Sequence, residues 1–148
     1  MNKLKIAFAT DHAASSIRNN VKEYIIGLGY EVEDFGYDGE GSCDYPDYAS
    51  KAAKAIAQGK ADKGILICGT GIGMAIAANK IKGIIAATIW SEDTARLAVQ
   101  HNRADIACMG SRTNTMKELC DMARVFLTTE FEERHKPRID KVKALEKE

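Results

Sequence analysis

Short apolar runs alternate with segments of helical periodicity along all 148 residues, and this rhythm most constrains the fold of the chain. Five of the runs have the length of strands. Because strands separated by helices pair in parallel and need cover on both faces, the pattern predicts one domain, residues 1–148, with a three-layer α/β fold. We expect strands over 6–9, 31–35, 64–68, 84–89 and 106–109, and helices over 15–28, 46–58, 74–81, 91–98 and 115–127. A charged tail, 130–148, follows.

The charge balance and the cysteines exclude several classes of protein. Lys plus Arg equals Asp plus Glu, 21 against 21, which argues against nucleic acid or an anionic membrane as a partner. The four cysteines form no C-x-x-C pair, so zinc spacing is absent and we expect no metal. The apolar segment after Met1-Asn2-Lys3 has only about six residues, too few for a signal-peptide core. These features favour a reduced, soluble, cytoplasmic protein.

In open parallel sheets, ligands bind beyond the carboxyl ends of the strands. The segments that follow the expected strands are therefore the first candidates for a site. They are 11–12, 36 onward, 68–73, 90–91 and 110–112.

The segment 67–74, Ile-Cys-Gly-Thr-Gly-Ile-Gly-Met, ends a strand and opens a helix. Alternate glycines let backbone N–H groups face a ligand, and the helix N-terminus favours an anion or a developing oxyanion. It is not a Walker A loop, because Gly-Lys-Ser/Thr is missing. It is not a dinucleotide fingerprint either, because Met74 stands where glycine is needed. A tight turn that only spaces the strand from the helix remains an alternative.

Cys68 ends the expected strand directly before this loop. Its thiolate would be a general base if a substrate carbon lay against it. Spacing alone favours a small buried hydrophobic residue, which most free cysteines are.

Other polar residues have a functional and a structural interpretation. Asp11-His12 would bind sugar hydroxyls and phosphate, or Asp11 would cap the next helix. His101 would shuttle a proton near neutral pH, or lie on the surface. Arginine can bind phosphate oxygens bidentately, so arginines near a site are candidates for a phosphate anchor. The structural interpretation is that the segment 132–138 is an ordinary solvent-exposed charged segment. The arginine candidates are Arg112, Arg134 and Arg138.

Together these pieces resemble the ribose-5-phosphate isomerase B family, which also includes the galactose-6-phosphate isomerase subunits. The resemblance extends from residue 5 to about 140. It is carried by Asp11-His12-Ala13, Asp44-Tyr45-Pro46, the block 67–73, Ala77-Ala78-Asn79-Lys80, His101-Asn102, Gly110-Ser111-Arg112 and Arg134-His135.

The resemblance implies a Rossmann-like five-stranded fold in a homodimer or a dimer of dimers. It implies that ribose 5-phosphate and ribulose 5-phosphate interconvert, in the pentose phosphate pathway, without a cofactor. Cys68 is then the base that moves a proton between C2 and C1 through a cis-enediolate. The residues implied around the reacting oxygens are Thr70, Gly69, Gly71 and Gly73.

The resemblance also implies roles for the remaining site residues. His101 assists ring opening, Asn102 contacts the sugar, and Asp11 and Tyr45 line the sugar site. His12, Arg112, Arg134 and Arg138 hold the phosphate. Some of these residues reach the site from the neighbouring subunit, and we expect the tail 130–148 to pack on that subunit.

Three features depart from the usual pattern of the family. Glu132-Glu133 stand where glycines are common, Asp105 replaces a frequent asparagine, and Pro137 disfavours helical geometry at Lys136. They leave two alternatives open. One is a six-carbon substrate, allose 6-phosphate or galactose 6-phosphate. The other is a non-catalytic sugar-phosphate binding module, which would need neither Cys68 nor His101.

Overall fold

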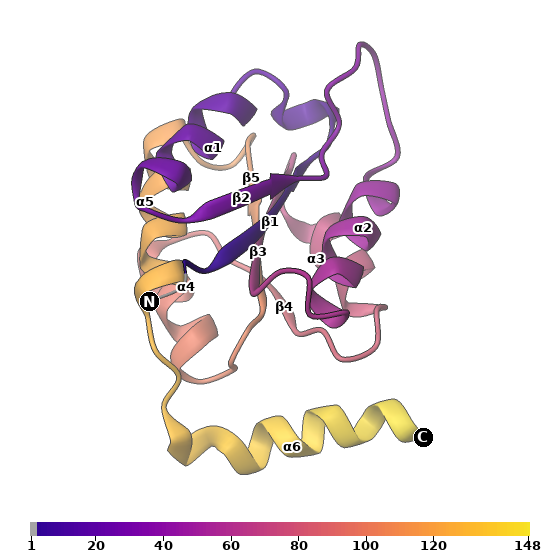
Figure 1. Ribbon diagram of the computed structural model, residues 1–148, viewed down its shortest axis with the longest axis vertical. Helices are drawn as coiled ribbons and strands as arrows, with labels where there is room; N and C mark the ends of the chain where they lie inside the picture. Colours follow the sequence, from indigo (N-terminus) through magenta and orange to yellow (C-terminus); the bar gives the residue numbers. More distant parts are fainter. Residues whose placement is uncertain (1–2) are drawn as a thin grey trace.

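The computed structural model describes residues 3–148, and its centre is one sheet of five parallel strands. The strands are β1 (Lys5–Thr10), β2 (Glu31–Asp34), β3 (Lys63–Cys68), β4 (Ala86–Thr88) and β5 (Ile106–Gly110). Their order across the sheet is β2-β1-β3-β5-β4 (Figure 1). The prediction of a single-domain three-layer α/β fold with a five-stranded parallel sheet is confirmed.

Helices cover both faces of the sheet (Figure 1). They are α1 (Arg18–Gly27), α2 (Tyr45–Ala57), α3 (Ile72–Asn79), α4 (Glu92–Gln100) and α5 (Met116–Thr128). A further helix, α6 (Lys136–Ala144), lies outside these two layers. On one face α1, α4 and α5 pack against alternate strand residues such as Phe8 and Ile65. On the other face α2 and α3 pack against Leu66 and Ile106. This alternation is what a strand covered on both sides requires.

The first helix begins later than predicted because a separate turn precedes it. The side chain of Asp11 accepts the N–H of Ala13 at 2.9 Å and caps a 3-10 turn, His12–Ala14. The α-helix then begins at Arg18 and not at residue 15. Ser91 caps α4 as expected, because its side chain accepts the N–H of Thr94 at 3.0 Å.

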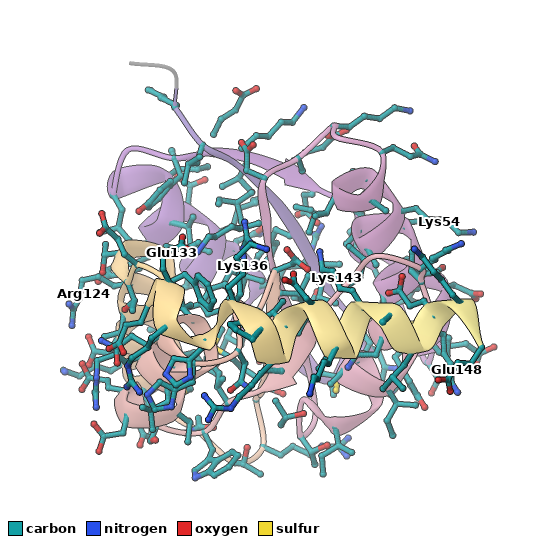
Figure 2. All side chains as sticks on the ribbon, turned by 90° about the horizontal axis from the view of Figure 1, so that it is seen from below. Lys54, Arg124, Glu133, Lys136, Lys143 and Glu148 are labelled. Carbon is teal, nitrogen blue, oxygen red and sulfur yellow. The ribbon has the colours of Figure 1, made fainter. Side chains whose placement is uncertain are left out.

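The charged tail forms a helix that crosses the amino edge of the sheet (Figure 2). The expectation that Pro137 disfavours helical geometry at Lys136 is wrong, since Lys136 opens α6. In the first turn proline lacks only an N–H that has no acceptor within the helix. The helix is attached through buried Ile139, and the 3-10 turn that follows it, Leu145–Lys147, is attached through Glu146, which accepts the N–H of Gly83 at 2.8 Å. Within residues 3–148 no helix is both long and apolar enough to cross a bilayer.

Candidate active site

The order of the strands places a topological switch point at the carboxyl ends of β1 and β3. The chain moves from β1 outward to β2 and then returns to the other side of β1, so the connections diverge between β1 and β3. Ligands bind at such switch points in open α/β sheets. Asp11 follows β1 and Cys68 ends β3 at this point, and the N–H of Asp11 donates to the carbonyl of Ile67 at 3.2 Å.

The sulfur of Cys68 lies inside the turn that leads to α3. Its side chain is buried, and the N–H of Gly71 donates to Sγ at 3.1 Å. Gly71 caps α3, whose first N–H groups have no acceptors within the helix. The hydroxyl of Thr70 accepts the N–H of Ile72 at 3.2 Å, and this fixes the exposed turn. A thiol therefore lies beside amide donors that suit a negatively charged oxygen.

Two glycines let the loop lie directly on the end of β5. Gly71 has φ +83°, and a Cβ on it would lie 2.8 Å from the carbonyl oxygen of Cys108. A Cβ on Gly110 would lie 2.4 Å from the hydroxyl oxygen of Thr113 and 2.7 Å from Cα of Thr70. A side chain at either position would push the loop away from the sheet, so glycine is required there.

Tyr45 and Arg112 flank this loop. A Cβ on Gly73 would lie 2.7 Å from the ring of Tyr45, so the ring covers the start of α3. A Cβ on Gly69 would lie 3.4 Å from Nη1 of Arg112, so the guanidinium lies over the turn. Arg112 is held there by its N–H, which donates to the carbonyl of Gly69 at 2.9 Å. The exposed cation beside the N-terminus of α3 makes this edge favourable for an anion.

His12 lies at the same edge with a defined tautomer. Its Nδ1 accepts the N–H of Cys43 at 3.1 Å, so the proton resides on Nε2. The contact also attaches the loop between β2 and α2 to the end of β1. His12 therefore presents an N–H donor from a half-buried ring.

The remaining predicted residues lie at the opposite, amino edge of the sheet. His101 and Asn102 follow α4 and precede β5. Cys68 pairs with Gly110, and Ile106 at the start of β5 lies four residues earlier, about 13 Å away along a parallel strand. Within one chain, the structure therefore separates His101, Asn102, Arg134 and Arg138 from Cys68 and its neighbours.

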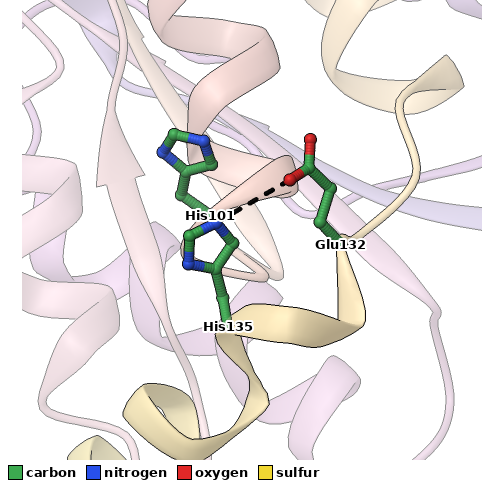
Figure 3. Close-up of side chains that lie close together, drawn as sticks. All are labelled: His101, Glu132 and His135. Carbon is green, nitrogen blue, oxygen red and sulfur yellow. Dashed lines mark ion pairs between the residues drawn. The ribbon is translucent and has the colours of Figure 1, made fainter.

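The amino edge has its own organised cluster (Figure 3). The rings of His101 and His135 lie 4.4 Å apart between centroids, at 44°. Arg138 donates from Nη1 to Nδ1 of His135 at 3.0 Å. Because arginine only donates, the proton of neutral His135 resides on Nε2, which is buried and has no hydrogen-bond partner within residues 3–148. Burial and the charges of Arg134 and Arg138 lower the pKa of His135.

The ligand-type atoms of His101, Glu132 and His135 lie within 4.8 Å of one another, which is close enough to consider a metal. The chemistry does not favour one. Nε2 of His135 carries a proton in the tautomer that Arg138 imposes, and a metal requires the lone pair. Two guanidinium groups beside one carboxylate give the cluster a net positive charge. This edge suits an anion better than a cation.

Two residues, Ser111 and His135, belong to motifs that the sequence analysis singled out, but their positions in the structure were not predicted. The N–H of Ser111 donates to the carbonyl of Cys68 at 2.8 Å, and its hydroxyl donates to the carbonyl of Ala13 at 2.9 Å. Ser111 thus joins the ends of β3 and β5 to the turn His12–Ala14 that follows β1, and its place after a strand was the available signal. His135 is buried although the charge of 132–138 indicated a solvated segment. No local signal reveals that burial.

The fold and its polar edges define an α/β enzyme with a site for a small anionic substrate. The model of the Ribose/Galactose Isomerase family matches residues 6–142, so the chain belongs to this family of isomerases. Ribose-5-phosphate isomerase B of Escherichia coli (strain K12) is 38% identical over 143 residues, 96% of each chain.

Solved structures agree with this assignment over nearly the whole chain. The type B ribose 5-phosphate isomerase of Leishmania infantum has a TM-score of 0.95 and 43% identity, covering 99% of this chain and 98% of that one. Ribose-5-phosphate isomerase B of Mycoplasma genitalium, with bound ribulose-5-phosphate, has a TM-score of 0.92 and 40% identity, covering 97% of each chain.

Proposed function

We propose that the protein interconverts ribose 5-phosphate and ribulose 5-phosphate by proton transfer, with Cys68 as the base. The observation that carries the proposal is the buried Cys68 thiol, held by the Gly71 amide inside an anion-favouring turn at the switch point of the sheet. Family membership and a relative that binds ribulose-5-phosphate support this substrate.

The reaction needs a base beside a carbon and donors beside its oxygens. The Cys68 thiolate takes the proton from C2 of the open-chain sugar, which leaves a cis-enediolate, and the resulting thiol returns a proton to C1 while a second proton moves from O2 to O1. Negative charge develops on the oxygens during this step. Thr70 and the amides of Gly69, Gly71 and Gly73 stabilise that charge, and one such donor is typically worth about 3–4 kcal/mol. Both steps are proton transfers, so redox chemistry is not required.

The same proposal assigns the substrate contacts. Asp11 and Tyr45 line the sugar, and His12 donates its Nε2–H to the phosphate together with Arg112. His101 assists ring opening, Asn102 contacts the sugar, and Arg134 and Arg138 complete the phosphate grip. These last four residues belong to the amino edge, so they must come from a second copy of the chain.

A shared site of this kind requires a dimer, and the surface supports one. Ile72 and Ile76 lie one turn apart on α3 and are 55% and 57% exposed. Val142 and Leu145 form a second exposed apolar pair at the end of the tail, and they are 49% and 61% exposed. Two antiparallel protomers would bring the amino edge of one against the carboxyl edge of its partner and would cover such side chains. We therefore propose a homodimer, or a dimer of dimers, in which the tail packs on the partner.

A substrate panel tests the proposal. Purified protein is incubated with ribose 5-phosphate, allose 6-phosphate and galactose 6-phosphate, and kcat/KM is measured for each. We expect the highest value for ribose 5-phosphate. A higher value for a six-carbon sugar would replace the proposed substrate. Binding without any turnover, unchanged in Cys68→Ala, would establish a binding module.

A further inference from the structure

The carboxylate of Glu132 lies at the centre of the amino-edge cluster. Its Oε2 accepts Nε–H of Arg134 at 2.8 Å. The same oxygen lies 3.8 Å from Nε2 of His135 (Figure 3). The backbone fixes this position, because the N–H of Glu132 donates to the carbonyl of Gln100 at the end of α4, at 3.0 Å. The backbone of Glu132 is therefore anchored to α4, and its carboxylate contacts both Arg134 and His135.

Glu132 determines where Arg134 lies. The side chain of Arg134 is 67% exposed, so packing does not hold it, and among residues 3–148 its ion-pair partner is Glu132. A guanidinium binds an oxyanion through pairs of neighbouring N–H groups. The carboxylate takes Nε–H and thereby blocks the face of the guanidinium that includes this donor. The unpartnered Nε2–H of His135 faces the same oxygen.

We propose that Glu132 acts as an internal anion that competes with phosphate for Arg134, and so sets how tightly this edge holds a phosphate group. The inference rests on the proposed function, in which Arg134 anchors the phosphate of the sugar. Phosphate must either displace the carboxylate from Nε–H or bind beside a second negative charge. Each possibility weakens binding, so Glu132 is a positioning residue that acts through Arg134.

Glu132→Gln is the decisive variant, because glutamine keeps an oxygen that can accept Nε–H of Arg134 and removes only the charge. Glu133→Gln is the matched control. It removes the same charge one residue away, from an exposed side chain that has no ion pair within the described residues 3–148. The first measurement is the Kd of inorganic phosphate by calorimetry at fixed ionic strength and pH 7.5. The second is KM and kcat for ribose 5-phosphate.

We expect Glu132→Gln to lower the Kd of phosphate and the KM of the sugar phosphate by roughly three- to tenfold, the effect of one close charge at a solvated site. We expect kcat and the melting temperature to change little, and Glu133→Gln to change Kd by less than about twofold. Equal effects in both variants, an unchanged Kd in Glu132→Gln, or weaker binding in it would overturn the inference. So would the absence of saturable phosphate binding in the unsubstituted protein.

The phosphate titration requires no turnover, so the experiment can refute either the inference or the proposed function without refuting the other. Tighter phosphate binding in Glu132→Gln, without isomerisation of any sugar phosphate, would remove the proposed function and leave the inference standing. Isomerisation with an unchanged phosphate Kd in Glu132→Gln would overturn the inference and leave the proposed function standing.

Discussion

The amide of Gly71 donates a hydrogen bond to the sulfur of Cys68 across 3.1 Å, and this contact ties the proposed base to the N-terminus of α3. The donor is a backbone amide, and the N–H of Arg112 separately holds the loop through the carbonyl of Gly69 at 2.9 Å, so we expect the loop to survive replacement of the thiol. The position of the base and the amide donors around it are thus one structural unit.

Cys68→Ser tests the role of the thiol itself. The hydroxyl is a far weaker acid than the thiol, so we expect kcat to fall by roughly 10²–10⁴-fold, the usual contribution of a general base. Unfolding free energy should change by no more than about 1 kcal/mol, since the side chain stays small. Cys120→Ser, on α5, is the control and should keep full activity. Undiminished turnover in Cys68→Ser would remove Cys68 from the base role.

Gly71→Ala tests the close approach between the loop and β5. The alanine would require a φ of +83° and a Cβ 2.8 Å from the carbonyl oxygen of Cys108. We expect a loss of roughly 2–4 kcal/mol in unfolding free energy, measured with urea, together with lower activity. The control is Gly59→Ala, which has φ +75° and open space around Cβ. It should lose only about 1 kcal/mol. Equal losses in the two variants would show that contact with β5 is unimportant.

The shared site is tested by combining two inactive variants. Cys68→Ala damages the carboxyl edge and His101→Ala the amino edge, so a mixed dimer holds one intact site. Co-expressed chains that assort at random should recover roughly a quarter of the unsubstituted activity, because half the dimers are mixed and each has one good site. Cys68→Ala with Arg112→Ala damages the same edge twice and should recover nothing. Failure of the first pair to recover activity would contradict a site built from two protomers.

Ionisation of the Asp34 side chain makes the stability of the fold depend on pH. Burial alone would raise its pKa, but hydrogen bonds from Arg18, the Gly36 amide and Lys22 outweigh burial and lower the pKa below its ordinary value. A lowered pKa in the folded state gives stability that is present at neutral pH and is lost as pH falls through the folded value.

The unfolding free energy of Asp34→Asn should therefore be about 1 kcal/mol lower than that of the unsubstituted protein at pH 7. This difference in unfolding free energy should shrink below pH 4. Urea unfolding at pH 7, 5 and 3 measures this. A difference that stays constant across this range would show that the charge of Asp34 is not responsible.

The sequence predicts the layers and the carboxyl edge well, for a physical reason. Apolar runs such as 64–68 are long enough to show strand burial, and the ends of parallel strands meet at one edge. That rule places Asp11 and Cys68 together without knowledge of the loops. The helix starts at Arg18 and Ile72 are less predictable, because each depends on a local turn that precedes the helix.

The amino edge could not be predicted from local patterns. The segment 132–138 is charged enough to be solvated, and α6 buries only Ile139 among its own residues. The burial of His135 comes from contact with the end of α4, 34 residues earlier.

Proton NMR of the protein with ribose 5-phosphate, in deuterated water that contains EDTA, tests most directly whether Cys68 catalyses isomerisation by proton transfer. We expect ribulose 5-phosphate with solvent deuterium at C1, and loss of this product in Cys68→Ser. No conversion, conversion that EDTA abolishes, or unlabelled product made equally fast by Cys68→Ser would contradict it.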